Sequence, residues 1–295
     1  MTSTAKPADS RVGPPPTRTD SADGSPAEAR PFYPVQILRF VVGYGCYFGG
    51  NLAFLLCGLP LVILLAPFPR LQYRFVHWLV HAALTVLTRW YLPLLGVYRI
   101  VEISGLSNAR AAAPVIYAAN HRGRIDALMV LSLLERTGVV VKSKYARIGV
   151  LAALVRHFDF VSVDAHLISS VSAAMELSRG LLRQGKSLLV FPEGSRSASG
   201  RLQPFKSIAF RLAEETRRPV VPVIVHSTCP FMAKVPGSIL PRERNRYRVR
   251  FLEPCIPAEG DTAETLGDRV YKRMAAELKQ LDRGTAWEVR GREEP

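Results

Sequence analysis

The chain has 295 residues, a formal net charge of +15 and four cysteines. This length allows one sizeable domain with appendages, and a core large enough to fold unaided. No two cysteines have the close spacing of a zinc site or a redox motif, so cysteine-based metal or redox chemistry gains no support. We therefore expect reduced, structural cysteines, as in a protein that faces the cytosol.

The positive charge is concentrated in the middle of the chain. Residues 31–256 hold 28 basic and 11 acidic side chains, a net charge of +17, whereas residues 257–295 have a net charge of −2. Beside a hydrophobic segment, such a basic body predicts contact with anionic phospholipid, at roughly 1 kcal/mol per nearby Lys or Arg. A positive surface that only keeps the protein soluble is the alternative interpretation.

The first 96 residues are expected to contain a disordered segment and then a membrane-associated one. Residues 1–34 are rich in Pro, Ser, Thr, Ala and Asp, and they cannot bury enough apolar surface to become ordered. Within 35–96, the thirty residues 40–69 contain no Asp, Glu, Lys or Arg. About 20 such residues in a helix cross a hydrocarbon core, so this run predicts a membrane segment. Several glycines and Pro60 interrupt it, which leaves a single span and a re-entrant segment both open.

A second apolar stretch, residues 75–98, is broken by Arg89 and Pro93. Its aromatic and partly polar composition is typical of a helix at the membrane interface. His77 and His81 are four residues apart and could share a helix face, but no carboxylate accompanies them. The zinc-protease pattern is therefore absent, and we predict no metal site.

From residue 97 onward, short apolar runs alternate with helical patterns, which indicates an α/β fold with a mixed sheet flanked by helices. The predicted strands are 97–103, 114–119, 138–141, 158–163, 187–191, 220–225 and 247–252, and the predicted helices are 125–136, 166–183, 207–217 and 263–282. We assign residues 97–284 to one α/β domain. Residues 285–295 are expected to form a polar tail.

The first motif with chemical potential is Asn-His-Arg-Gly-Arg-Ile-Asp at residues 120–126. His121 follows a predicted strand, and ligands of α/β folds usually bind at the carboxyl ends of strands. Asp126 falls in the first turn of the next helix, from which its carboxylate can reach back to the imidazole. A carboxylate on one ring nitrogen fixes the tautomer and leaves the other nitrogen free to accept a proton. The alternative is a helix-capping aspartate beside an unrelated histidine.

The second motif is Phe-Pro-Glu-Gly-Ser-Arg-Ser at residues 191–197, directly after another predicted strand. A glycine turn with an arginine and hydroxyl donors could hold a phosphate on Arg196. A surface loop with a Glu–Arg pair would have the same composition, so this motif alone leaves both interpretations open.

Together these segments resemble the glycerolipid acyltransferase family. Its first motif, N-H-x-x-x-x-D, is matched by residues 120–126, and its third motif, F-P-E-G-[TS]-R-S, is matched in full by residues 191–197. Its lysine-led second motif aligns with residues 142–164, and its apolar V-P-V-x segment with residues 221–224. The resemblance covers about residues 97–255, and an amino-terminal membrane anchor is also usual in the family.

The resemblance implies a membrane-bound O-acyltransferase that moves a fatty acyl group from acyl-CoA or acyl-carrier protein to a lysophospholipid hydroxyl, most simply that of 1-acylglycerol-3-phosphate. His121 would be the general base, oriented by Asp126, with no covalent intermediate, metal or cofactor. The remaining site residues would bind substrates: Asn120, Lys142, Glu193, Gly194, Ser195, Arg196 and Pro222. Lys142 and Arg196 would lie near the acceptor phosphate, and Pro222 would shape the acyl side. The enzyme would reside at the inner membrane with its catalytic domain facing the cytoplasm.

Several positions depart from the family pattern on the acceptor side. Gly123 stands where serine is common, Asp159 replaces a usual glycine, and Ala165 stands where many members carry an arginine near the acceptor phosphate. These changes leave open an acceptor without glycerol, such as a lyso-ornithine lipid or a pigment or polyene head group.

Other classes of function fit the sequence less well. A lipid hydrolase would need an activated nucleophile, and no G-x-S-x-G elbow is present. The basic run 242–248 could track nucleic-acid phosphates, but no recognition motif accompanies it, so we expect no nucleic-acid partner. A scaffold without catalytic activity would not require the intact pair of His121 and Asp126.

Overall fold

The computed structural model describes residues 54–144, 159–164, 166–238 and 245–293, with scattered residues between 34 and 52. The described residues all belong to one compact unit, residues 31–295. Nearly all of the expected disordered segment 1–34, and most of the first half of the apolar run 40–69, lie outside the described residues.

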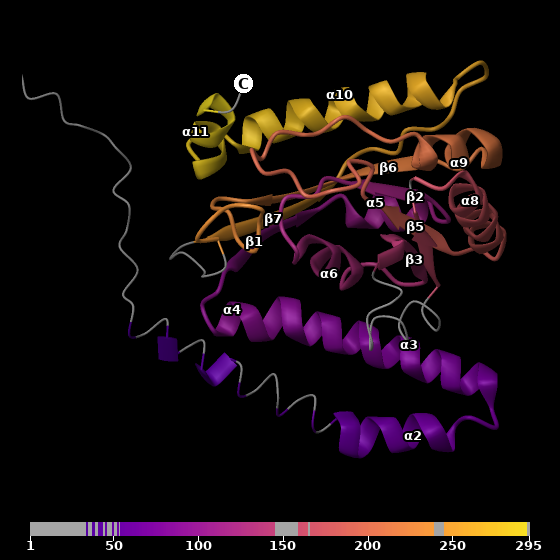
Figure 1. The fold of residues 1–295 in the computed structure, drawn as a ribbon, viewed down its shortest axis with the longest axis vertical. Coiled ribbons are helices and arrows are strands. Elements are labelled where there is room, and N and C mark those ends of the chain that lie inside the picture. Colours follow the sequence, from indigo (N-terminus) through magenta and orange to yellow (C-terminus); the bar gives the residue numbers. More distant parts are fainter. Residues whose placement is uncertain are drawn as a thin grey trace, which may run out of the picture. The chain divides into compact units, whose positions relative to one another are not determined.

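A seven-stranded sheet forms the centre of this unit (Figure 1). The strands are β1 (Arg99–Ser104), β2 (Ile116–Ala119), β3 (Thr137–Lys142), β4 (Phe160–Val163), β5 (Ser187–Val190), β6 (Val220–Ser227) and β7 (Arg246–Phe251). They lie in the order β1-β7-β6-β2-β5-β3-β4, and only the β6–β7 pair is antiparallel. All seven predicted strands are thus confirmed, and β2 with β5 and β6 forms the middle of a mixed sheet.

The middle strands are buried on both faces, because helices cover each side of the sheet. Successive side chains of β2 point to opposite faces, so Ile116 and Ala118 join one core, and Tyr117 and Ala119 join the other. Strands buried in this way are continuously apolar, which explains why the sequence patterns of β2, β5 and β6 lack polar alternation.

One face of the sheet packs against three long helices: α8 (Ile168–Arg183), α9 (Ile208–Thr216) and α10 (Ala263–Leu281). The opposite face packs against α5 (Leu106–Ala111) and α6 (Asp126–Leu131). The predicted fold class, a mixed sheet flanked by helices, is therefore confirmed. Helix α6 ends five residues before the predicted end, and α5 was not predicted.

The carboxyl-terminal residues differ from the expectation of a polar tail. Residues 286–293 form a further helix, α11 (Ala286–Glu293), and its Trp287 is only 2% exposed. The composition of α11 is strongly polar, which conceals its one buried aromatic anchor from pattern-based prediction.

The helices before the sheet are η1 (Phe54–Gly58), α2 (Leu59–Leu64), α3 (Pro69–Thr85), η2 (Val86–Tyr91) and α4 (Leu92–Leu94). The segment η2 is π-helical and continues α3 directly into α4, so Arg89 does not break the predicted interfacial helix. Across the part of the chain that the structure describes, no helix is both long enough and apolar enough to cross a bilayer. The membrane helices expected within residues 35–96 therefore gain no support from the fold.

Helix α3 is tied to the catalytic domain through Asp159. The Tyr73 hydroxyl donates to Asp159 Oδ2 over 2.6 Å, and Lys186 Nζ donates to both carboxylate oxygens over 2.8 Å. Burial alone would raise the pKa of Asp159, but hydrogen bonds from His77, Lys186 and Tyr73 hold it well below its usual range. Asp159 replaces a usual family glycine and keeps a glycine-like backbone, with φ at +54°.

Gly105 lies between β1 and α5, at a point where the chain packs closely against β7. Its φ is +70°, and a Cβ there would lie 1.9 Å from the carbonyl oxygen of Phe251. Gly185 has a similar φ of +74° but no atom within 4 Å of the corresponding position. We expect Gly185→Ala to lower the unfolding free energy by about 1–2 kcal/mol, the cost of the left-handed backbone. Gly105→Ala should lower it by roughly 3 kcal/mol or more, because overlap adds to that cost.

Urea unfolding of the two variants measures the difference directly. Equal losses of unfolding free energy would contradict the close packing of β1 and α5 against β7.

Candidate active site

The loop of residues 120–125 connects the carboxyl end of β2 to α6, at the middle of the sheet. Asn120, its first residue, is 1% exposed and pairs with the backbone of β6. Its Nδ2 donates to the Val225 carbonyl over 3.0 Å, and its Oδ1 accepts from the Val225 N–H over 2.7 Å. Asn120 thereby extends the β2–β6 pairing by one residue and fixes the start of the loop.

His121 and Asp126 lie in contact, as the sequence predicted. The imidazole Nδ1 is 3.2 Å from Asp126 Oδ2, and Asp126 is 2% exposed while the His121 side chain keeps partial access to solvent. The same carboxylate oxygen accepts the N–H groups of Arg122 and Gly123, each over 2.7 Å. An oxygen already accepting from two amides also takes the acceptor role toward the ring. Nδ1 then carries the proton, and Nε2 is left to accept one.

Gly123 explains one departure from the family pattern. A Cβ at this position would lie 2.8 Å from the Phe231 carbonyl oxygen and 3.2 Å from Asp126 Oδ1. The segment after β6 presses on the loop here, and Arg124 donates its N–H to the Met232 carbonyl over 3.1 Å. A serine at position 123 would therefore push apart the turn that holds the Asp126 carboxylate.

The third motif, residues 191–197, follows β5 and lies beside the first because β2 and β5 are paired. Glu193 Oε1 accepts the His121 N–H over 2.7 Å, and Oε2 accepts the Gln203 N–H over 3.0 Å. The Ser197 N–H donates to the His121 carbonyl over 2.8 Å. Both backbone groups of the histidine are thus held by the third motif. Burial raises the pKa of Glu193 to about 7.

The other third-motif residues shape the turn. Gly194 has a φ of +66°, a backbone conformation that favours glycine, and a Cβ there would lie 2.9 Å from Lys206 Cε. Ser195 Oγ donates to Gln203 Oε1 over 3.2 Å, and Arg196 Nη1 donates to the Met232 carbonyl over 2.9 Å. Arg196 therefore joins the third motif to the segment that also contacts the first motif.

A group of lysines lies at this edge of the sheet. Lys142 is the last residue of β3, and its pKa is lowered by partial burial and then by neighbouring ammonium groups. Those neighbours are Lys144, Lys206 and Lys234. Four cations from three segments of the chain create a local positive potential suited to an anionic group. The sequence assigned only Lys142 to the acceptor phosphate, because Lys206 and Lys234 come from segments distant in the chain.

The remaining predictions are only partly described. Pro222 is buried inside β6, where it lies opposite Ala118 of β2. Residues 145–158 and Ala165, which make up much of the second motif, lie outside the described residues. Among the described residues, no group of three His, Cys, Asp or Glu side chains could hold a metal ion.

Sequence reasoning missed a buried polar group behind the first motif. It consists of Arg122, His226 and Asp282, and Trp287 covers it. The one available signal was an arginine inside the first motif that no substrate role required.

Several known proteins are similar to this chain. A family model described as acyltransferase matches residues 100–226. The 1-acyl-sn-glycerol-3-phosphate acyltransferase of Cocos nucifera is 30% identical over 57% of this chain and 53% of its own length. The alpha form of that enzyme from Bos taurus is 29% identical over 61% of this chain and 63% of its own. The chain thus spans less than two thirds of the length of these relatives.

A solved structure shares the fold. The crystal structure of the 1-acyl-sn-glycerophosphate acyltransferase from Thermotoga maritima superposes with a TM-score of 0.67 at 20% identity, covering 84% of this chain and 98% of that one. The matched family model spans β1 to β6 and so includes both motif loops. On this evidence, the chain is similar in sequence to 1-acyl-sn-glycerol-3-phosphate acyltransferases, and it contains a segment that matches the acyltransferase family model.

Proposed function

We propose that this protein transfers a fatty acyl group from a thioester to the hydroxyl of a lysophospholipid, with 1-acylglycerol-3-phosphate as the first candidate acceptor. The observation that carries the proposal is the contact of 3.2 Å between His121 Nδ1 and Asp126 Oδ2 beside a group of lysines. The names of the two relatives support the same acceptor. The donor is acyl-CoA or acyl-carrier protein.

The acyl group passes directly from the thioester to the acceptor oxygen. His121 Nε2 takes the proton of the acceptor hydroxyl, and the oxygen attacks the thioester carbonyl carbon. The new C–O ester bond forms, the C–S bond breaks, and the leaving thiolate takes the proton back from Nε2. Asp126 stabilises the imidazolium while it exists. No acyl group is attached to the enzyme at any stage.

Glu193 contributes by position. Both of its carboxylate oxygens accept backbone N–H groups, so it holds the His121 backbone in place, and its burial leaves little of its surface open to substrate. The acceptor phosphate then binds to Lys142, at the end of β3, and to Arg196, in the loop that follows the neighbouring strand β5.

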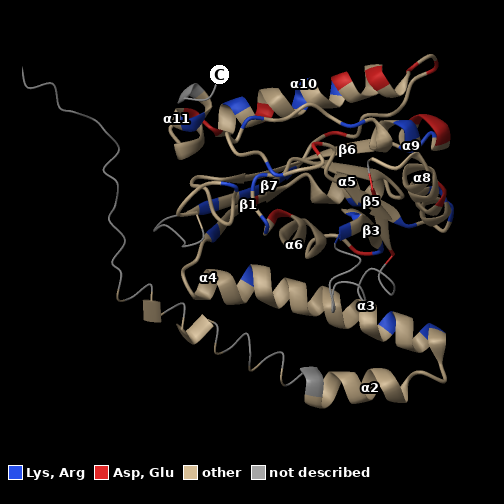
Figure 2. Cartoon of the chain, viewed as in Figure 1, with Lys and Arg blue, Asp and Glu red and all other residues tan. Residues whose placement is uncertain are grey.

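We also propose that the amino-terminal helices lie on a phospholipid surface. No Asp or Glu occurs between residues 31 and 101; α2 has no charged residue, and the charged residues of α3 are all basic (Figure 2). The large exposed apolar residues of this segment include Leu59, Ile63, Leu64, Phe68, Leu71, Trp78 and Trp90. Such a surface fits the boundary between lipid head groups and acyl chains. It would place the catalytic domain at the cytoplasmic side of the inner membrane.

Replacement of the base provides the first test of the proposed chemistry. His121→Ala should lower kcat by about 10²–10⁴-fold, because the acceptor hydroxyl loses its proton acceptor. The assay offers labelled acyl-CoA or acyl-carrier protein with lyso-lipids and identifies the products by mass. His81→Ala, a histidine change within α3, is the control and should keep full activity. Full activity of His121→Ala in a folded protein would refute the assignment.

Arg196 tests the acceptor side. Arg196→Ala should raise the KM for a phosphate-bearing acceptor roughly tenfold to a hundredfold, with little change in the KM for the donor, because a charge-assisted hydrogen bond is lost. Arg196→Lys keeps the charge and should show a smaller rise. An unchanged acceptor KM would mean that the acceptor has no phosphate at this site, which favours the alternative of a non-glycerol head group.

The three tryptophans of the chain test the membrane surface. Trp78 and Trp90 are 63% and 71% exposed on the amino-terminal helices, whereas Trp287 is 2% exposed in α11. Vesicles with brominated acyl chains should quench the fluorescence of Trp287→Phe, which retains the two exposed tryptophans. They should leave the double variant Trp78→Phe/Trp90→Phe unquenched. Equal quenching of both proteins, or of neither, would contradict the proposed orientation.

A further inference from the structure

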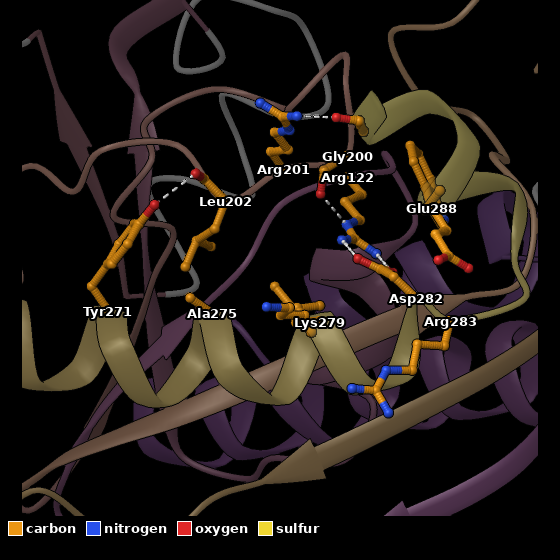
Figure 3. A pocket seen from close by; sticks show the side chains of 13 residues that line it. Arg122, Gly200, Arg201, Leu202, Tyr271, Ala275, Lys279, Asp282, Arg283 and Glu288 are labelled. Carbon is orange, nitrogen blue, oxygen red and sulfur yellow. Dashed lines mark hydrogen bonds and ion pairs between the residues drawn. The ribbon is translucent and has the colours of Figure 1, made fainter. Parts of the chain in front are cut away.

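The side chain of Arg122 turns away from the proposed substrate side and is 4% exposed. Its guanidinium makes two parallel hydrogen bonds to the carboxylate of Asp282, at 2.7 Å and 2.6 Å (Figure 3). Its Nε donates to the carbonyl of Gly200 over 2.8 Å. A single buried arginine thus joins the first motif, the segment after the third motif, and the end of α10.

The carboxyl-terminal helix closes this arrangement. The Arg122 guanidinium lies 4.9 Å from the centre of the Trp287 ring, which also packs so tightly on Gly200 that a Cβ there would be 2.2 Å from Trp287 Cε3. His226, at the end of β6, is fully buried, and its Nε2 lies 3.3 Å from Asp282 Oδ1. Arg122 is the buried partner of this ion pair, with 5% of its side chain exposed against 18% for Asp282. Removal of Asp282 therefore leaves an uncompensated buried charge on Arg122.

Arg122 also touches the catalytic carboxylate through its backbone. Its N–H donates to Asp126 Oδ2, the oxygen that contacts His121 Nδ1. Arg122 is thus held at both ends, by its backbone N–H at Asp126 and by its guanidinium at Gly200 and Asp282, so a displaced guanidinium pulls on the loop that carries that N–H. The anchor is Asp282, which lies 160 residues further along the chain.

We propose that Arg122, Asp282 and Trp287 form a carboxyl-terminal clamp that positions the His121–Asp126 pair for the acyl transfer proposed above. These are positioning residues, since they reach the reacting atoms only through Asp126. The inference rests on the proposed function, and it adds that α10 and α11 belong to the catalytic apparatus although the matched family model ends at residue 226.

The test removes the charge of Asp282 and leaves its shape. In the full chain, Asp282→Asn should lower kcat about tenfold to a hundredfold, the size of effect expected from a small misplacement of a catalytic pair. Both KM values should change by less than about threefold, because no substrate contact is lost. Asp282→Glu, which restores the charge, should recover a large part of the rate.

A second ion pair on the same helix provides the matched control. Asp261 and Arg269 lie at the opposite end of α10, also 2.6 Å apart and away from the motif loops. Asp261→Asn should keep kcat within about twofold of the wild-type value. A loss of kcat in Asp282→Asn no greater than in Asp261→Asn would overturn the clamp.

A hollow beside the clamp makes a further result of the same experiment informative. It has a volume of about 530 Å³ and is lined by Arg122 and by residues of the 200–202 segment, α10 and α11 (Figure 3). A rise confined to the donor KM in Asp282→Asn would overturn the clamp and assign this hollow to the donor instead. Should Asp282→Asn fail to fold, Trp287→Leu keeps the ion pair and should still lower kcat about threefold or more at unchanged KM.

The proposed function and the clamp fail in different ways. A wild-type protein without acyl transfer would refute the function alone. In that case the NMR signals of the His121 ring test the clamp. Asp282→Asn should shift these signals, whereas Asp261→Asn should leave them unchanged. Unshifted His121 signals in Asp282→Asn would overturn the clamp independently of any activity.

Discussion

One oxygen atom, Asp126 Oδ2, organises the candidate site. It lies within hydrogen-bonding distance of the His121 ring and accepts the backbone N–H groups of Arg122 and Gly123. Three donors can converge on one oxygen only if the chain turns tightly between β2 and α6. That turn needs a residue without a Cβ at position 123, since the Phe231 carbonyl lies within 2.8 Å of the place a Cβ would occupy. The tautomer of His121, and with it the direction of proton transfer, follows from this turn.

The turn is stabilised from two sides, and each stabilising contact carries a cost. Glu193 is buried to receive the backbone of His121, and its pKa of about 7 reflects the unfavourable desolvation of its charge. Arg122 is buried to reach Asp282, where two hydrogen bonds offset the loss of hydration. Burial of Glu193 and of Arg122 is energetically unfavourable, and neither side chain takes part in the proposed reaction. Such costs are typical of sites where the position of functional groups matters more than stability. Under the proposed function, the folding free energy and the reaction rate therefore depend on the same few contacts.

The sequence predicted the sheet well, because its central strands are apolar runs separated by helical patterns. It also predicted the contact of His121 with Asp126, since both lie within one strand–loop–helix unit. The buried role of Glu193 was not predicted, because a Glu–Arg loop normally indicates a solvated pair. Asp282 was beyond reach, since nothing in a single sequence links it to Arg122. Helix α11 was missed for a related reason: its order depends on one tryptophan that packs on a distant glycine.

Two departures from the family pattern, Gly123 and Asp159, lie where this chain makes contacts of its own. Asp159 replaces a glycine but keeps the left-handed backbone, and its carboxylate binds Tyr73 of α3 and Lys186 before β5. A glycine could satisfy the backbone but could not hold the helix. The second motif, which leads toward the substrate edge of the sheet, thereby acquires a direct link to the helix that we propose lies on the lipid surface. Because Lys186 directly precedes β5, and β5 leads into the third motif, these contacts fix α3 to a strand that carries part of the candidate site. The exchange of a usual glycine for Asp159 thus has a structural reason, which is to join α3 to that strand.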